Sequence, residues 1–237
     1  MKRNHILLTS SIVQFALFLL LAWWARKQRV ALSDVVMTHL LQKKQSAVPR
    51  TVVKVLNTLT GSAVFMNVLV IPIAAVLWRM RLRVEAGMLM VTCWTGGLVR
   101  SAIKQVVDRP RPSPLLAHVG KQTKGKSFPS GHVASSVYVW GWLFALGLLA
   151  KKKAQPGRKV LLGSAAMGVA FTGPARVYLG DHWATDVLGG YLFGGGWLSL
   201  WLSLYFRWRE RGLPTNVPSL HKSTISASSG SGFGNTS

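Results

Sequence analysis

Long apolar stretches, separated by short basic ones, dominate this chain of 237 residues. Amphipathic soluble helices repeat their apolar positions about every 3.6 residues, and these stretches show no such alternation. Each is close to the roughly 20 residues that cross a bilayer. The pattern therefore predicts six membrane-spanning helices, over residues 6–24, 56–78, 86–107, 132–150, 160–179 and 184–206.

The fold class follows from the backbone. In lipid, every backbone N–H and C=O group must be bonded within the protein, which leaves helices and closed barrels. The apolar stretches are too long and too uniform for barrel strands. We therefore expect an all-α fold, a bundle of six transmembrane helices over residues 1–212. A secretory signal would also begin with basic residues, but the long apolar core and the lack of a small-residue cleavage site favour a retained first helix.

Two regions do not fit a span. Residues 26–55 mix basic and apolar positions at near-helical spacing, which predicts an amphipathic segment at the membrane interface. Residues 213–237 are rich in Ser, Gly, Thr and Asn, a composition that predicts a disordered tail.

The chain is strongly basic although it is apolar on average. The chain has 29 Lys and Arg against 6 Asp and Glu, a formal net charge of +23, yet its mean hydropathy is +0.30. Nucleic-acid-binding proteins are basic but polar, and here apolar spans divide the cations, so no nucleic-acid partner is expected. Cys93 is the single cysteine, which excludes a disulfide scaffold.

Orientation is not decided by counting cations. Six crossings place both termini on one side, and the two sides then carry equal numbers of Lys and Arg. The compact basic cluster in residues 151–159 favours termini in the cytoplasm.

Polar residues interrupt the apolar pattern near the ends of predicted spans, in residues 104–112, 129–132 and 176–186. The first group follows the third span, the second precedes the fourth, and the third joins the fifth and sixth. Because two crossings separate the second group from the third, all three groups lie on one face of the membrane. The topology therefore allows them to form a single site.

The first feature of this site is concentrated positive charge. Lys104, Arg111 and Arg176 suit an anion, and the planar fork of a guanidinium group matches phosphate oxygens. Ser130 and Gly131 stand at a helix start, where free backbone N–H groups favour an anion and glycine permits close approach. These residues predict a phosphate site.

The second feature is a pair of imidazoles. His182 and Asp186 are four residues apart, so we expect them on one helix face, with the carboxylate fixing the tautomer and leaving the other ring nitrogen free to attack. His132 suits proton transfer. Together these groups describe phosphoryl transfer without a metal. No metal or other cofactor is expected, because the sequence has no carboxylate cluster suited to magnesium.

Each element taken alone has an ordinary explanation. Cations near helix ends extend to lipid headgroups, and a His–Asp pair at this spacing is commonly a surface contact. A non-catalytic membrane protein that binds anionic lipids through its basic loops would carry the same cations. The occurrence of all the elements on one face favours a catalytic site.

At this point the residues match a known signature. The chain resembles, over roughly residues 1–210, the type 2 phosphatidic acid phosphatases (PAP2), a lipid phosphate phosphatase superfamily that includes glucose-6-phosphatase and vanadium haloperoxidases. The family pattern is K-x6-RP, PSGH and SR-x5-H-x3-D. The matching residues here are Lys104, Arg111–Pro112, Pro129–His132, Arg176, His182 and Asp186.

The resemblance implies a role for each of these residues. His182 attacks phosphorus and forms a phosphohistidine, Asp186 orients it, and His132 protonates the leaving group and then activates water. The phosphate is bound by Lys104, Arg111, Ser130, Gly131 and Arg176. The family pattern has Ser where this chain has Ala175, and one lost hydrogen bond of about 0.5–1.5 kcal/mol predicts altered rate or substrate preference, with activity retained.

Four further residues have less specific roles. Arg109 has two expected roles, a phosphate contact or a headgroup contact. Arg100 lies one turn before Lys104, and an ionisable group inside a span is either functional or paired structurally. Asp108 and Asp181 are expected to be local partners of the cations.

The resemblance also bears on substrate and location. We expect a lipid phosphate or diphosphate phosphatase in a bacterial plasma membrane, with its site at the outer face. Undecaprenyl diphosphate is the leading substrate, because Lys121, Lys124 and Lys126 suit a multiply charged headgroup. The alternatives are phosphatidic acid, phosphatidylglycerophosphate or lipid A, or transfer of the phosphoryl group to an alcohol. The expected partners are the lipid substrate and the bilayer, and the oligomeric state is not fixed by the sequence.

Overall fold

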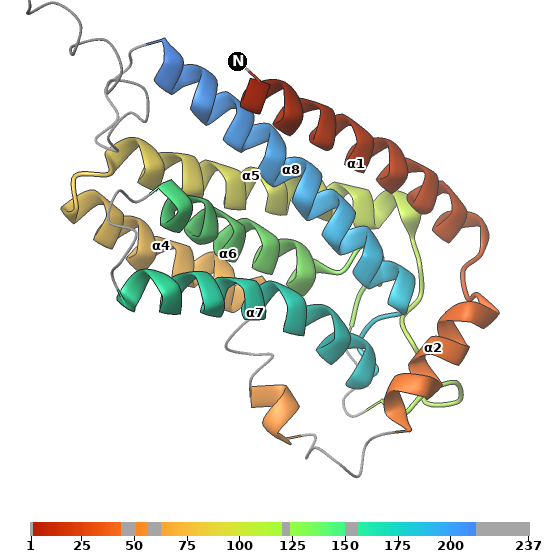
Figure 1. Cartoon of the computed structure of the whole chain (residues 1–237). Coiled ribbons are helices and arrows are strands. Elements are labelled where there is room, and N and C mark those ends of the chain that lie inside the picture. Colours follow the sequence, from red (N-terminus) through yellow and green to blue (C-terminus); the bar gives the residue numbers. More distant parts are fainter. Residues whose placement is uncertain (1, 44–50, 56–62, 120–123, 150–155, 212–237) are drawn as a thin grey trace, which may run out of the picture.

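The structure, a computed structural model, describes residues 2–43, 51–55, 63–119, 124–149 and 156–211, and every regular element in these ranges is a helix (Figure 1). The all-α prediction is thereby confirmed. Besides a helical turn at residues 51–55, the helices are α1 (Lys2–Lys27), α2 (Leu32–Gln42), α4 (Ala63–Arg79), α5 (Arg83–Val107), α6 (Gly131–Leu149), α7 (Pro156–Tyr178) and α8 (Ala184–Glu210).

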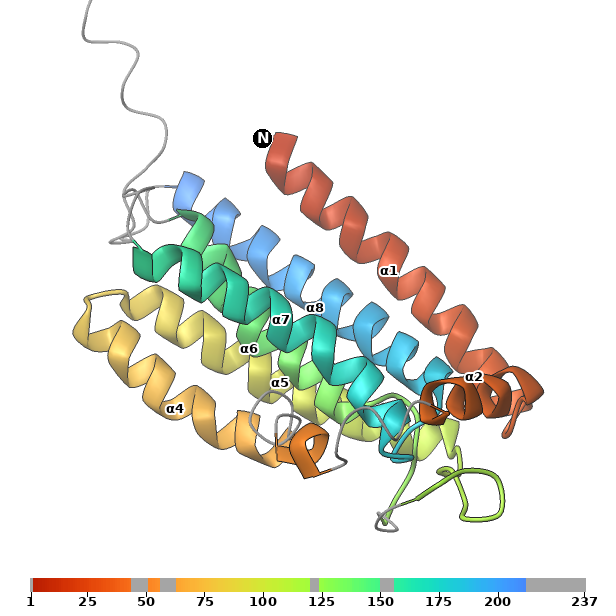
Figure 2. The same ribbon diagram turned by 60° about the horizontal axis from the view of Figure 1, so that its bottom comes forward.

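Five of these helices, α1, α5, α6, α7 and α8, are long and apolar enough to cross a membrane. The sixth predicted span, 56–78, corresponds to α4, a shorter apolar helix of 17 residues, and the residues 56–62 that begin the span lie outside the described ranges. The helices lie side by side in one bundle (Figures 1 and 2). The chain is therefore an integral membrane protein.

Helix α1 packs along α8 (Figures 1 and 2). The ring of Phe193 lies 6.1 Å from that of Phe15 and 5.3 Å from that of Phe18, between ring centroids. Ser11 Oγ donates a hydrogen bond of 2.8 Å to the carbonyl of Gly196. The first apolar stretch is thus an integral helix of the bundle.

Helix α6 contacts α4, α5, α7 and α8. Trp142 Nε1 donates to Thr92 Oγ1 of α5 at 2.9 Å, and Ser136 Oγ donates to the carbonyl of Gly168 of α7 at 3.0 Å. Lipid supplies little hydrophobic drive between helices, so such interhelical bonds and close packing hold a membrane bundle together. They fix the start of α6, where the polar residues gather, relative to its neighbours.

Helix α2 lies at the end of the bundle where α1 ends and α8 begins (Figures 1 and 2). Its buried residues are the polar ones, Asp34, Thr38 and Gln42, which recur every four positions, whereas Leu32 and Leu40 are exposed. Gln42 Nε2 donates to the carbonyls of His118 and Tyr178 at 3.0 and 3.1 Å. Helix α2 thus has a polar face, which contacts the protein, and an apolar face, which is exposed.

Close packing between α6 and α8 gives a first testable prediction. A Cβ atom at Gly190 would lie 2.9 Å from the carbonyl oxygen of Ser130 and 2.9 Å from Cβ of Val133, and neither atom is a flexible side-chain end. Gly190→Ala should therefore destabilise the protein by about 1–3 kcal/mol, the usual cost of overpacking. Thermal unfolding in detergent measures the effect.

Gly163→Ala in α7 is the matched control, because a Cβ there meets nothing within 4 Å. It should be neutral or slightly stabilising, since alanine favours helix over glycine. Equal unfolding midpoints for the two variants would contradict this description of the α6–α8 contact.

Candidate active site

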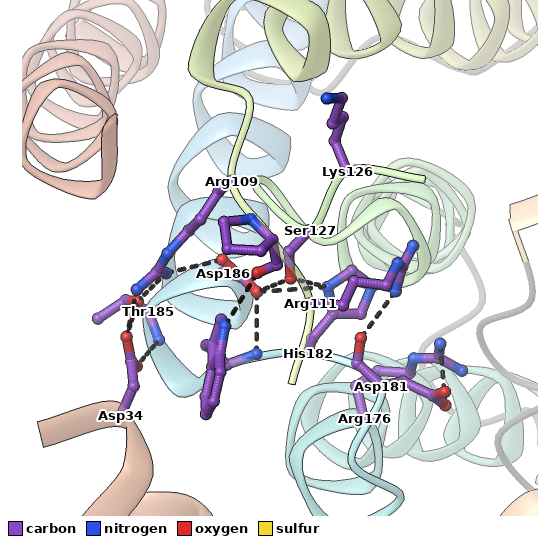
Figure 3. A network of polar contacts seen from close by, with 12 residues as sticks. Asp34, Arg109, Arg111, Lys126, Ser127, Arg176, Asp181, His182, Thr185 and Asp186 are labelled. Carbon is purple, nitrogen blue, oxygen red and sulfur yellow. Dashed lines mark hydrogen bonds and ion pairs between the residues drawn. The ribbon is translucent and has the colours of Figure 1, made fainter. Parts of the chain in front are cut away.

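Residues of the first and third polar groups lie together (Figure 3), and a backbone bond joins the second group to them. They come from the last turns of α5 and the loop that follows it, from the first turn of α6, and from the connection between α7 and α8. The backbone N–H of Ser130 donates to the carbonyl of Asp186 at 2.9 Å, which fixes the start of α6 against the start of α8. The predicted convergence of these groups is present in the structure.

Asp186 occupies the first turn of α8 and is completely buried. Its Oδ2 accepts a 2.9 Å hydrogen bond from the backbone N–H of Trp183, so the carboxylate caps the helix. Because α8 begins at Ala184, His182 lies in the bend before it. The prediction that His182 and Asp186 share a helix face was therefore wrong, since the cap, and not helical spacing, brings the two side chains together.

The His182 ring lies between a carboxylate and a guanidinium group (Figure 3). Its Nδ1 is 3.5 Å from Asp186 Oδ2 and 3.5 Å from Ser127 Oγ, and its Nε2 is 3.3 Å from Arg111 Nη1. Burial lowers the pKa of His182 well below its usual range, and the positive charge of Arg111 lowers it further. The imidazole is therefore neutral at neutral pH.

Arg111 is held by backbone carbonyls. Its Nη1 donates to the carbonyl of Asp181 at 2.7 Å, and its Nε donates to that of Gly125 at 3.1 Å. Burial lowers the pKa of Arg111, but a guanidinium group keeps its charge at any ordinary pH. The residue thus presents a fixed cation beside Nε2 of His182.

Lys104 and Arg176 complete the set of predicted cations. Lys104 Nζ donates to the carbonyls of Lys126 and Ser127 at 2.7 and 3.2 Å, which ties α5 to the loop before α6. Arg176 Nη2 pairs with Asp181 Oδ2 at 3.0 Å. Asp181 is therefore a local partner of a cation, as the sequence predicted.

Several buried polar atoms near the start of α6 have no hydrogen-bond partner in the described part of the chain. They are Ser130 Oγ, Arg176 Nε and Arg100 Nε. A Cβ atom at Gly131 would meet Arg100 Nη1, so the Arg100 guanidinium lies against the helix start. Buried polar groups without partners are costly, and an anion here would satisfy them.

His132, in the first turn of α6, is the second imidazole of the site. Its ring centroid lies 6.5 Å from that of His182, with 63° between the ring planes. The two imidazoles are thus close enough for one to transfer a proton to a group that the other attacks.

Arg109 has neither of its two expected roles. Its side chain is completely buried, and its Nη1 donates to Asp186 Oδ1 at 2.8 Å while its Nη2 donates to Asp34 Oδ2 at 2.5 Å. Its Nε donates to the carbonyl of Arg29 at 3.0 Å. Arg109 therefore binds protein carboxylates on the side of Asp186 that faces away from His182 (Figure 3).

Sequence reasoning missed Asp34, Ser127 and Thr185. Ser127 Oγ donates to Asp186 Oδ2, and Thr185 Oγ1 contacts both Asp34 and Arg109. The scarcity of acids was the available signal for Asp34. With 6 Asp and Glu against 29 Lys and Arg in the whole chain, each acid is expected to pair with a cation.

The site suits an anion better than a metal cation. Within the described ranges, no group of three or more His, Cys, Asp and Glu side chains could hold a metal ion. The groups that converge here are cations and imidazoles, and its central carboxylate already accepts bonds from Arg109, Ser127 and the Trp183 backbone.

The comparisons with known proteins agree with this geometry. The model of the PAP2 superfamily matches residues 84–211, which contain all the predicted site residues. The chain belongs to the PAP2 superfamily.

Two curated relatives carry names that state an activity. The chain is 29% identical to phosphatidylglycerophosphatase B of Bacillus subtilis (strain 168) over 141 residues, which are 56% of this chain and 64% of the relative. It is 30% identical to lipid A 1-phosphatase of Rhizobium etli over 129 residues, 50% of this chain and 49% of the relative. The matched regions span less than two thirds of each relative.

One solved structure shares the fold. The crystal structure of a transmembrane PAP2-type phosphatidylglycerolphosphate phosphatase from Bacillus subtilis aligns with a TM-score of 0.73 at 23% identity, over 84% of this chain and 96% of that one. The likeness supports the arrangement of the transmembrane bundle.

The buried Arg109 gives a prediction about stability. Arg109→Met removes the shared partner of two buried carboxylates, Asp34 and Asp186. Breaking a buried ion pair on one side costs about 3–5 kcal/mol, because the remaining charge stays buried without compensation. We expect a strongly lowered unfolding temperature in detergent.

Arg29→Met is the matched control. Arg29 pairs with Asp108 at 2.9 Å, but 61% of its side chain is exposed. Exposed pairs contribute about 0–1 kcal/mol, so this variant should unfold close to wild type. Similar losses in the two variants would show that Arg109 is not the buried clamp described above.

Proposed function

We propose that the chain is a lipid phosphate phosphatase that uses His182 as its nucleophile. The placement of His182 carries the proposal, since its Nδ1 faces Asp186 and its Nε2 faces Arg111. A carboxylate beside Nδ1 favours the tautomer with the proton on Nδ1, which leaves the lone pair on Nε2 for attack.

In the first step, Nε2 of His182 attacks phosphorus, and the bond between phosphorus and the lipid-side oxygen breaks. His132 donates a proton to that oxygen, and a phosphohistidine forms. In the second step, His132 takes a proton from water, whose oxygen attacks phosphorus. The P–N bond breaks, inorganic phosphate leaves, and both histidines return to their starting states.

The cations stabilise the charge on the transferring phosphoryl group. Arg111 lies beside the attacking nitrogen, and Lys104 and Arg176 come from α5 and α7. Ser130 Oγ and the N–H groups at the start of α6 supply uncharged donors. Fixed donors aimed at the developing charge are the main source of rate enhancement in phosphoryl transfer.

Ala175 is the one departure from the family pattern. It is buried one residue before Arg176, where a serine would add a hydroxyl. We infer that its absence alters rate or substrate preference, because the charged donors of the site remain in place.

Undecaprenyl diphosphate remains our leading substrate. A cavity of about 330 Å³ is lined by Arg29, Asp108, Arg109, Pro110, Lys126 and Gly125, and the carbonyl of Gly125 accepts from Arg111. Arg29 and Lys126, which pair with Asp108 in the structure, would suit a second phosphate group that takes the place of that carboxylate. Lys124 is exposed in the same loop, and Lys121 lies outside the described residues. The names of the relatives keep phosphatidylglycerophosphate and lipid A as alternatives, beside phosphatidic acid.

We further propose that the protein lies in a bacterial plasma membrane with its termini in the cytoplasm and its site at the outer face. Support comes from the basic cluster at residues 151–159. Arg158 and Lys159 of this cluster begin α7, and Arg176 of the site lies near the other end of that helix. Basic residues concentrate on the cytoplasmic side of transmembrane helices.

Phosphate release by purified protein tests the activity. Phosphatidic acid, phosphatidylglycerophosphate, lipid A and undecaprenyl diphosphate are each supplied in detergent without added metal. Wild type should release phosphate from at least one of them, and His182→Ala should abolish release, because the nucleophile is gone. His5→Ala, an exposed histidine near the start of α1, is the matched control and should behave as wild type.

The alternatives predict other results. If the chain is a lipid-binding protein without catalysis, no substrate releases phosphate beyond the level of His182→Ala. If it is a phosphotransferase, supplying an alcohol acceptor yields a phosphorylated acceptor in place of inorganic phosphate. Faster release from the diphosphate than from the monophosphates would support the leading substrate.

The lowered pKa of His182 gives a prediction about pH. The neutral imidazole is the nucleophile, and a lowered pKa keeps it neutral below about pH 6.5, the ordinary pKa of histidine. The acid limb of kcat/KM, which reports groups of the free enzyme, should therefore lie below that value. A limb at or above it that does not match the ionisation of the substrate phosphate would show that His182 is not held neutral by its surroundings.

A further inference from the structure

Asp34 is a buried carboxylate at the end of the bundle that carries the site. It belongs to α2, outside the residues 84–211 that match the family model, and its side chain is 1% exposed. Oδ1 accepts a 2.9 Å bond from the backbone N–H of Thr185, and Oδ2 accepts a 2.7 Å bond from Thr185 Oγ1. Asp34 thus holds the residue next to Asp186 by two bonds.

Arg109 connects Asp34 to Asp186 directly (Figure 3). One arm of its guanidinium group donates to Asp34 at 2.5 Å and the other to Asp186 Oδ1 at 2.8 Å. All three side chains are buried, so little solvent screens their charges. Asp186 Oδ2 remains on the side of His182, which it approaches to 3.5 Å.

The net charge of Asp34, Arg109 and Asp186 together determines how strongly Asp186 attracts the ring of His182. One arginine between two carboxylates leaves a net charge of −1, whereas an arginine paired with Asp186 alone would leave none. A neutral pair would attract the imidazole less and would stabilise the positive charge that develops on the attacking ring less well.

We propose that Asp34 is a positioning residue for the nucleophile and acts through Arg109 and Thr185 on Asp186. Asp34 neutralises part of the positive charge of Arg109, and its bonds to Thr185 fix the first turn of α8. The negative charge of Asp186 is thereby only partly neutralised, and its Oδ2 stays on the side of Nδ1 of His182. The inference rests on the proposed phosphatase function.

The test compares Asp34→Asn with Thr38→Val in the full chain, purified in detergent. The first substitution keeps the shape of the side chain and an oxygen that can accept from Thr185, but it removes the charge. Thr38 is equally buried one turn further along α2, where its Oγ1 donates to the backbone carbonyl of Asp34. Values of kcat and KM are measured for whichever of phosphatidic acid, phosphatidylglycerophosphate, lipid A or undecaprenyl diphosphate wild type hydrolyses fastest.

We expect Asp34→Asn to lower kcat by about 10- to 100-fold, as is usual when the support of a reacting group is removed. KM should change by less than about twofold, because the phosphate-binding cations are untouched. Thr38→Val should keep the wild-type kcat. A kcat for Asp34→Asn equal to that of Thr38→Val would overturn the proposal.

A double-mutant cycle separates positioning from a general structural effect. If Asp34 acts through Asp186, the loss caused by Asp34→Asn should largely disappear in an Asp186→Asn background. Losses that multiply independently would refute that route of action. Should Asp34→Asn fail to fold, Arg109→Lys replaces it, because lysine keeps the charge but lacks the planar fork whose two arms reach Asp34 and Asp186. A wild-type kcat in Arg109→Lys would likewise overturn the proposal.

The same assays separate this inference from the proposed function. If wild type releases no phosphate, or His182→Ala releases as much as wild type, the proposed function fails and Asp34 has no nucleophile to position. If release depends on His182 but Asp34→Asn behaves as Thr38→Val, the function stands and the inference alone is refuted.

Discussion

The completely buried carboxylate of Asp186 is the interaction on which the geometry of the site depends. It caps α8 through the Trp183 backbone, accepts from Ser127 in the loop before α6, and accepts from Arg109 in the loop after α5. The two ends of the connection between α5 and α6 and the start of α8 therefore meet at two oxygen atoms. A buried carboxylate is stable only when such donors replace the water it has lost. The same hydrogen bonds therefore hold the polypeptide segments together at this end of the bundle and place Asp186 beside His182.

The other acids also have defined partners in this basic protein. Asp181 binds Arg176 and Asp108 binds Arg29 and Lys126, while at the other end of the bundle Glu85 accepts from Tyr205 and Glu210 from Asn4. With so few acids among 29 bases, most cations have no carboxylate to pair with. The excess positive charge is therefore available to anionic lipid headgroups at the membrane surfaces and, within the site, to phosphate.

The fold was largely predictable because the length and uniformity of apolar stretches determine helices in lipid. The spacing of the polar groups relative to those stretches also predicted that Lys104, Arg111, Arg176 and His182 would converge. Two features were not predictable from local pattern. The periodicity of α2 predicts two faces but not which of them contacts the protein. The four-residue spacing of His182 and Asp186 is the same whether both residues lie in a helix or His182 precedes the helix that Asp186 caps. Both depend on long-range contacts such as those of Asp34.

The bond between Asp34 and the start of α8 has a consequence for modularity. The region recognised by family resemblance, residues 84–211, contains the reacting groups but not α1, which packs along α8, or α2, which closes the end of the bundle. The region that the family model matches is thus shorter than the region that holds the site in place. A fragment trimmed to the recognised boundary would expose the Arg109 guanidinium to solvent and lose the partner that shares it with Asp186.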